Sequence, residues 1–203
     1  MYTSACFRDW NPYHFLDVGA MATGMGLGYD WLYNWMDESQ RKIVRDSIVN
    51  KAIVPINEDF DDAPRSRSWN WRGDLADNWC LVISGVGSCG AMAIVDELDG
   101  QNLEKAQRAM EQCLLDIRRA LSLFSPLGAY EEGPSYWEYS MRYYPLTVTA
   151  LETGIGTALG YDDIPGLKLT DKYLLAVNGP VKMFSYHDAY TSDSIVPPAM
   201  MYI

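Results

Sequence analysis

Apolar residues recur at helical spacing through most of the chain, and this periodicity constrains the fold more than any other feature. It is clearest over residues 102–124, where apolar side chains repeat every three or four positions and form one stripe. Alternating patterns typical of strands are scarce before residue 180. We therefore expect an all-α architecture of stacked helical hairpins. The stripe comprises Leu103, Ala106, Met110, Leu114, Ile117 and Leu121.

Two helices are expected in the first part of the chain. Residues 15–36 read as a long buried helix whose many small residues would let a neighbouring backbone approach closely. A second helix is expected to start at Asp37 or Glu38, either of which can cap it, and to run to about residue 53. Glu38 and Lys42 have the spacing of a favourable ion pair on that helix.

The longest irregular segment, residues 58–77, is polar and carries arginines and tryptophans. Long segments without regular structure are usually functional or disordered, and the tryptophans argue against disorder. Helical spacing resumes over residues 78–98 and, after the stripe of 102–124, over roughly 135–160. Pro134 is well suited to the first turn of that last helix.

The pattern changes after Gly179, where "VKMFSYHDAY" alternates and predicts a strand. The chain then ends in an apolar segment without a polar tail, which favours a cut before a further domain. We expect a helical domain over 1–178 and a strand-bearing segment over 179–203 that leads into a β domain beyond these residues.

Composition excludes several classes of partner. At 203 residues and 48% apolar content the chain is sufficient for one globular domain. A net charge of −11 disfavours nonspecific binding to nucleic acid or to an anionic membrane. No apolar run approaches the ~18 residues of a membrane span, and no signal peptide opens the chain. The cysteines lack metal-ligand spacing and are expected to be buried small hydrophobes; they are Cys6, Cys80, Cys89 and Cys113.

Cofactor motifs are also missing from the sequence. It contains no phosphate loop, no dinucleotide fingerprint and no nucleophile elbow. Its two histidines, His14 and His187, lie too far apart in sequence for a metal motif. We expect neither a metal nor a cofactor.

The stretch "GAYEEGPSYWEYSMRYYP" at 128–145 concentrates aromatic and charged residues. In a helix that begins near Pro134, its aromatic side chains fall on two faces. One face is the natural core stripe, and the other is either a second buried stripe or the wall of a cleft. The core face comprises Trp137, Met141 and Tyr144, and the second face comprises Tyr136, Tyr139 and Tyr143.

The charged residues of this stretch, and Asn78 earlier in the chain, can be interpreted as structural or as site residues. Glu131 and Glu132 precede the helix, where they either stabilise its N-terminus or contribute to a site. Glu138 and Arg142 have the spacing of a surface ion pair. Asn78 stands at the start of its helix, either as an N-cap or as a site residue.

Three motifs that follow in order resemble the helical domain of the heparinase II/III-like family, which includes alginate lyases. They are "WNPYHFLDVGAMATGMGLGYDWLYNWM", "DNWCLVISGVGSCGAMAI" and the stretch at 128–145. The resemblance extends from about Asp9 to Ala199. It implies an incomplete (α/α) toroid of helical hairpins followed by an antiparallel β domain, with the active site between them, and a periplasmic or secreted location.

The resemblance also implies a reaction. Lyases of this family cleave uronic-acid polysaccharides, such as glycosaminoglycans and alginate, by β-elimination. The tyrosine of their Glu-Gly-Pro-x-Tyr motif corresponds to Tyr136, as the base that removes the C5 proton. The asparagine that neutralises the substrate carboxylate corresponds to Asn78. Further candidates for substrate contact are His14, Trp69, Trp71, Arg72, Glu132, Tyr139 and Arg142.

The sequence departs from the family in two places. Many of these lyases have a histidine where this chain has Trp79, and a histidine of the β domain would lie outside the 203 residues. The isolated chain is therefore expected to be nearly inactive. Two other functions stay open: a non-catalytic carbohydrate-binding or scaffold domain, and a glycoside hydrolase on a helical toroid, which would use Glu131, Glu132 and Glu138.

Overall fold

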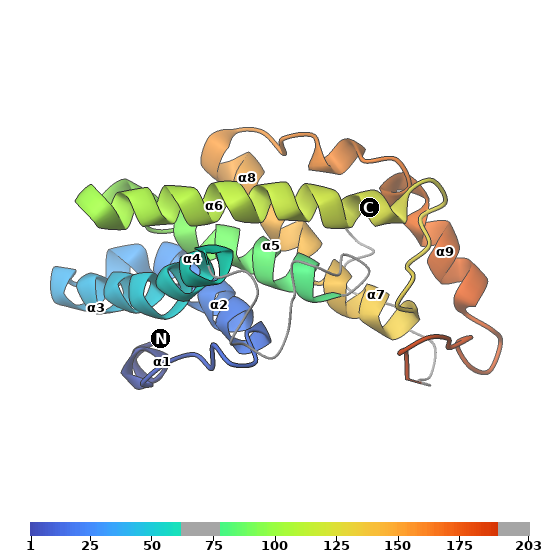
Figure 1. Ribbon diagram of the computed structural model, residues 1–203, viewed down its shortest axis with the longest axis horizontal. Coiled ribbons are helices and arrows are strands. Elements are labelled where there is room, and N and C mark those ends of the chain that lie inside the picture. Colours follow the sequence, from blue (N-terminus) through green and yellow to red (C-terminus); the bar gives the residue numbers. More distant parts are fainter. Residues whose placement is uncertain (62–77, 191–203) are drawn as a thin grey trace. The chain divides into compact units, whose positions relative to one another are not determined.

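The computed structural model describes residues 1–61 and 78–190, which are mainly helical (Figure 1). The described part of the chain contains no β-strand, so the all-α prediction is confirmed. The chain divides into two compact units. The described part of unit 1 is 1–61 and 82–115, and that of unit 2 is 78–81 and 116–190, so the division falls within two helices.

Unit 1 holds the N-terminal helices and most of two long ones. Its elements are α1 (Tyr2–Cys6), α2 (Leu16–Leu32), the 3-10 turn η1 (Tyr33–Trp35), α3 (Glu38–Ile48), the π-helical segment η2 (Val49–Ile53), α4 (Val54–Asp61), most of α5 (Asn78–Met92), the 3-10 turn η3 (Val95–Glu97) and most of α6 (Gly100–Leu121).

Helices α2 and α5 approach each other closely at glycines. A Cβ atom on Gly26 would lie 3.1 Å from the Cys89 carbonyl oxygen, and one on Gly90 would lie 3.1 Å from the Ala22 side chain. Larger residues at these positions would push the helices apart, so Ala22 and Gly26 have the role that the sequence predicted for the small residues of 15–36.

Helix α3 begins as the sequence predicted but pairs its charges differently. Asp37 caps the helix, and its carboxylate and the Gln40 side chain form a reciprocal capping box. The predicted Glu38–Lys42 pair is wrong, because Glu38 bonds Arg45 at 2.5 Å, while Lys42 bonds Asp46 at 2.6 Å. Arg45 lies two turns after Glu38 on the same face, and its longer side chain spans that distance.

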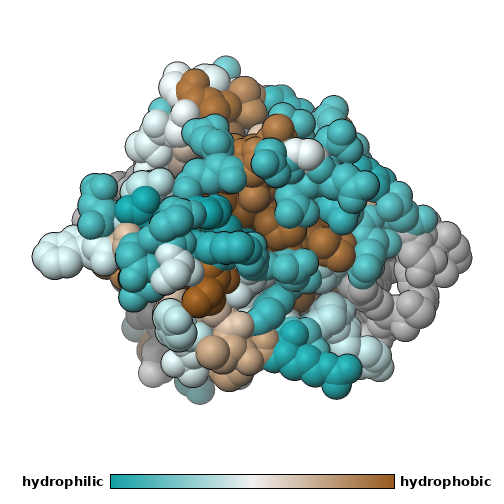
Figure 2. Space-filling model, turned by 90° about the vertical axis from the view of Figure 1, so that its left-hand side faces the viewer, coloured by the Kyte–Doolittle hydropathy of each residue, from teal (hydrophilic) through white to brown (hydrophobic). Residues whose placement is uncertain are grey.

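The amphipathic prediction for 102–124 is confirmed. All six stripe residues of α6 are buried or half-buried, whereas Glu104, Arg108 and Glu111 are exposed. Hydrophilic side chains also dominate the face drawn in Figure 2, with apolar side chains visible between them. Of the four cysteines, Cys6 is exposed, so the prediction of burial is wrong there, and the other three are buried.

Unit 2 holds the aromatic stretch and the C-terminal helices. Besides the start of α5 and the end of α6, its elements are η4 (Ser122–Phe124), α7 (Pro134–Met141), α8 (Tyr144–Ile155), η5 (Tyr161–Asp163), η6 (Leu167–Leu169) and α9 (Thr170–Val177).

The helix expected over 135–160 is divided into α7 and α8. Pro145 lacks the N–H that would bond the Met141 carbonyl, so a continuous helix cannot pass this point. The core face is correct for Trp137 and Met141, which are fully buried, while Tyr144 is half-buried. The Trp137 indole donates to Thr170 Oγ1 at 2.7 Å, which joins α7 to α9.

The strand predicted over 181–190 is wrong. This segment forms one antiparallel bridge, between Asn178 and Met183, and then continues as a loop. The loop bends at His187, whose φ of 50° is incompatible with an extended strand. Residues 191–203, where the predicted transition to a β domain would continue, lie outside the described residues. Within the described part, no helix is both long and apolar enough to cross a membrane.

Candidate functional site

The predicted site residues fall into three groups: those outside the described residues, one in unit 1, and the rest in unit 2. Trp69, Trp71 and Arg72 lie outside the described residues. His14 belongs to unit 1, where its imidazole Nδ1 lies 2.9 Å from Asp17 Oδ2. The other five belong to unit 2, and they are Asn78, Glu132, Tyr136, Tyr139 and Arg142.

Asn78 and Glu132 form a doubly hydrogen-bonded pair. The backbone N–H of Asn78 donates to Glu132 Oε2 at 2.7 Å, and the side-chain Nδ2 donates to Glu132 Oε1 at 2.8 Å. Both residues are buried, with exposed fractions of 2% for Asn78 and 7% for Glu132. The carboxylate is held by neutral amide donors on both of its oxygens, so the contact is directional and specific.

This pair revises two sequence interpretations. Asn78 is the first residue of α5, and its side chain donates to Glu132, whereas an N-cap side chain accepts. Glu132 directly precedes α7 in sequence, but its carboxylate bonds the first residue of α5. Its negative charge is favourable there because it faces the positive end of the helix dipole.

A tight turn presents Glu132 to α5. The Gly133 N–H donates to the Tyr130 carbonyl at 3.2 Å, which closes a turn over residues 130–133. Gly133 has a φ of 96°, a conformation that residues with a Cβ atom rarely adopt. Pro134 then starts α7, as the sequence predicted.

Tyr130 supports this turn from inside the unit. Its ring is 2% exposed and stacks on Phe124 with centroids 5.2 Å apart. Its hydroxyl lies 3.1 Å from Ser140 Oγ and donates over a longer distance, 3.5 Å, to Glu132 Oε2. We call Asn78, Tyr130, Glu132 and Tyr136 the turn site.

Tyr136 lies in the first turn of α7, three residues after Gly133. Tyr136, Tyr139 and Tyr143 are all half-buried, which fits the wall of a cleft better than a second buried stripe. The rings of Tyr139 and Tyr143 pack edge to face, with centroids 5.5 Å apart. Tyr144, assigned to the core face, is half-buried too, so the role of the Tyr136 face as a cleft wall stays a prediction.

Arg142 is bound to Glu138, as the sequence predicted. Its Nε and Nη2 donate to Glu138 Oε1 at 2.8 and 2.5 Å. This hydrogen bond is the main reason why the pKa of Arg142 lies above its usual value. The pair is not a simple surface bridge, because the Glu138 side chain is only 12% exposed while that of Arg142 is 57% exposed.

The glutamates proposed for a hydrolase are mostly engaged. Glu132 is bound by Asn78 and Glu138 by Arg142, while Glu131 is exposed. Hydrolysis requires two carboxyl groups that face one sugar. The contacts of these side chains do not favour that arrangement.

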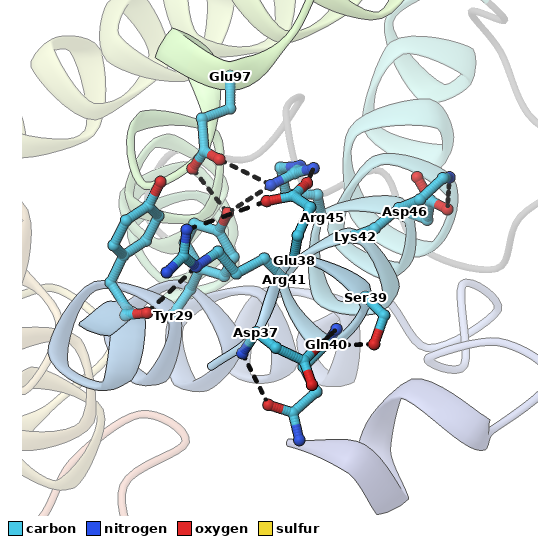
Figure 3. Close-up of polar contacts among 11 residues, drawn as sticks. Tyr29, Asp37, Glu38, Ser39, Gln40, Arg41, Lys42, Arg45, Asp46 and Glu97 are labelled. Atoms are coloured by element: carbon cyan, nitrogen blue, oxygen red, sulfur yellow. Dashed lines mark hydrogen bonds and ion pairs between the residues drawn. The ribbon is translucent and has the colours of Figure 1, made fainter. Parts of the chain in front are cut away.

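Unit 1 contains a polar cluster that the sequence analysis missed (Figure 3). The Tyr29 hydroxyl donates to Glu97 Oε1 at 2.6 Å, and Arg45 Nη1 donates to Glu97 Oε2 at 2.7 Å and to the Tyr29 hydroxyl at 3.0 Å. Arg45 Nη2 also donates to Glu38 Oε1 at 2.5 Å. We call Tyr29, Glu38, Arg45 and Glu97 the ionic cluster.

The ionic cluster joins α2, α3 and η3 and is suited to stabilisation. Burial, followed by the hydrogen bond to Glu97, raises the pKa of Tyr29 to about 12, so this hydroxyl is a poor base. Glu97 lies 52 positions after Arg45 and 68 after Tyr29, so local spacing could not have revealed its part in the cluster.

A cavity of about 360 Å³ also lies in unit 2. Its lining includes Tyr144, Glu152, Asp162 and Lys168 but no turn-site residue. Nothing in these contacts connects it to the chemistry of Tyr136, and we assign no role to it.

Comparison with known proteins adds no assignment: the chain matches no model of a known protein family and no curated protein. Among the described residues, no group of three or more His, Cys, Asp or Glu side chains could hold a metal ion.

Proposed function

We propose that this chain is the helical domain of a polysaccharide lyase that cleaves uronic-acid glycans by β-elimination. The observation that carries the proposal is the turn site. Asn78 and Glu132 are bonded to each other, and the turn that holds Glu132 leads directly into the helix turn of Tyr136. The type of reaction is inferred from the three sequence motifs, which resemble those of heparinase II/III-like proteins and follow in the same order.

In this proposal Tyr136 removes the C5 proton of a uronate and then protonates the departing O4 oxygen. A tyrosine acts as a base only when its phenolate is stabilised. The position of Tyr136 in the first turn of α7 contributes to this, because the N-terminal end of a helix favours negative charge.

Asn78 neutralises the substrate carboxylate in the same scheme. Glu132 Oε1 accepts a hydrogen bond from its Nδ2 group and so orients the amide, which in the proposal donates to the uronate and stabilises the enolate-like charge that develops. Tyr139 contributes an aromatic face to the cleft for a neighbouring sugar. Trp69, Trp71 and Arg72 remain proposed substrate contacts.

The proposed architecture is an incomplete (α/α) toroid of helical hairpins that is completed by a β domain. The succession of helices along the described chain is compatible with it. A glycan-binding scaffold without activity is the main alternative, and the same experiment distinguishes the two.

Tyr136→Phe tests the proposal, in the protein as its gene encodes it, with heparin-type and alginate oligosaccharides as substrates. Loss of the hydroxyl should lower kcat by about 10²–10⁴-fold, the usual contribution of a positioned acid-base group. The ultraviolet absorbance of the unsaturated uronate measures the product. Tyr143→Phe is the matched control, because it also removes a tyrosine hydroxyl but from a residue with no assigned substrate contact, and it should keep most of kcat. Wild-type turnover by Tyr136→Phe, or a saturated product, would refute the lyase.

A further inference from the structure

The loop that follows α9 makes direct contact with the turn of Glu132. The Tyr186 hydroxyl donates to the Tyr130 carbonyl at 2.6 Å, the same oxygen that accepts the Gly133 N–H at 3.2 Å. This carbonyl is the acceptor that closes the 130–133 turn. Tyr186 therefore holds the atom on which the geometry of the turn depends.

The Tyr186 hydroxyl also contacts a second tyrosine. The hydroxyls of Tyr173 and Tyr186 lie 2.8 Å apart. Because Tyr186 uses its hydrogen on the Tyr130 carbonyl, Tyr173 is the donor between them. Tyr173 belongs to α9 and is 8% exposed, so this contact fastens the loop to a buried helix.

The backbone of the same loop packs directly on Gly133. A Cβ atom on Gly133 would lie 2.5 Å from the Tyr186 carbonyl oxygen and 2.6 Å from the Ala189 side chain. The loop is itself closed by the Ala189 N–H, which donates to the Tyr186 carbonyl at 3.1 Å. Side chain and backbone of residues 186–189 thus reach both ends of the turn.

We propose that Tyr186 is a positioning residue for the turn site. It fixes the Tyr130 carbonyl, the 130–133 turn then directs the Glu132 carboxylate at α5, and Glu132 orients the amide groups of Asn78. Tyr186 contacts neither Asn78 nor a reacting atom in this role. The proposal deepens the proposed function, since it names a group on which carboxylate binding by Asn78 depends.

Amide exchange at Asn78 is the test, because its backbone N–H reports the contact with Glu132 without any need for catalysis. In the 203-residue chain, Tyr186→Phe should accelerate hydrogen exchange of this amide about tenfold, the effect expected for loss of one hydrogen bond. The matched control is Tyr173→Phe, which also removes a tyrosine hydroxyl but leaves the Tyr186–Tyr130 bond. It should change the exchange rate at Asn78 less than about twofold.

Equal effects of Tyr186→Phe and Tyr173→Phe, or no effect of either, would overturn the proposal. If Tyr186→Phe does not fold by circular dichroism, p-aminophenylalanine at position 186 replaces it, since this side chain keeps a donor at the same place. That variant must fold and retain wild-type protection at Asn78, or the proposal fails.

Measurements of turnover distinguish a failure of the positioning role of Tyr186 from a failure of the lyase proposal. If the lyase proposal is correct, Tyr186→Phe lowers kcat about tenfold and Tyr173→Phe does not, in line with the exchange rates. If the protein has no lyase activity, the exchange experiment still decides whether Tyr186 positions Asn78.

Discussion

The ionic cluster and the turn site each hold a glutamate carboxylate by hydrogen bonds, but Glu97 lies at the surface whereas Glu132 is buried. Glu97 is bound by a cation, Arg45, together with the Tyr29 hydroxyl, and the groups project from helices. Glu132 is bound by the neutral amides of Asn78 and projects from a turn that requires a glycine. The Arg45–Glu97 ion pair joins α3 to η3 and favours stability. A carboxylate that orients an amide beside a row of half-exposed tyrosines favours function.

The turn site should be broken most severely through Gly133. Gly133→Ala adds a Cβ atom 2.5 Å from the Tyr186 carbonyl and forces a positive φ on a residue that resists it. We expect a loss of about 3 kcal/mol in the free energy of unfolding by urea. Gly154→Ala is the control, because no atom lies within 4 Å of its Cβ position inside α8, and it should be neutral or stabilising. Similar effects of both variants would contradict the packing described.

Removal of the charge from Glu132 should have the next largest effect. Glu132→Gln keeps one acceptor but turns an NH2 group toward one of the two Asn78 donors. The expected loss is about 2 kcal/mol, within the range for hydrogen bonds to charged groups. Glu131→Gln, one position earlier and exposed, should change the free energy of unfolding by less than about 0.5 kcal/mol. Equal losses at the two positions would show that the Asn78 contact contributes nothing.

The ionic cluster should be broken by Arg45→Met. The Arg45 side chain is 13% exposed, and its loss leaves Glu97 without its cation. We expect destabilisation by about 1–2 kcal/mol in urea, less than for a fully buried pair because Glu97 is partly solvated. Arg108→Met removes an exposed ion pair with Asp61, in which the Arg108 side chain is 46% and the Asp61 side chain 64% exposed, and should lower the free energy of unfolding less than Arg45→Met does. A larger effect at Arg108 would reverse this ranking.

The smallest expected effect is a dependence on alkaline pH. Burial raises the pKa of Tyr29 to about 12 in the folded chain, from about 10 in the unfolded one. The folded state therefore retains the Tyr29 proton to a higher pH than the unfolded state does. The stability that this protonated hydroxyl contributes is complete below pH ~10 and is lost as pH rises toward ~12. Urea unfolding of Tyr29→Phe between these pH values should show a shallower decline than wild type. Tyr144→Phe should act similarly, since burial also raises the pKa of Tyr144 to about 12. Parallel curves for all three proteins would contradict this.

The sequence predicted those features that depend on nearby residues. The start of α3 at a capping residue, the start of α7 at Pro134 and the stripe of α6 all follow from interactions within one or two helical turns. The strand over 181–190 failed because the alternating pattern has no partner strand in the described chain, and a lone bridge does not make a sheet. The Glu38–Lys42 pair failed because Arg45 competes for the same carboxylate.

The sequence by itself determined the helical class, the starts of α3, α5 and α7 and the apolar stripe of α6, because these features depend on residues close together in the chain. Only the tertiary structure decided which groups meet. Asn78 and Glu132 are 54 positions apart in the sequence, and Tyr130 and Tyr186 are 56 positions apart. Contacts of this kind depend on how the helices pack and how the loops close. Neither can be deduced from the spacing of residues along the chain.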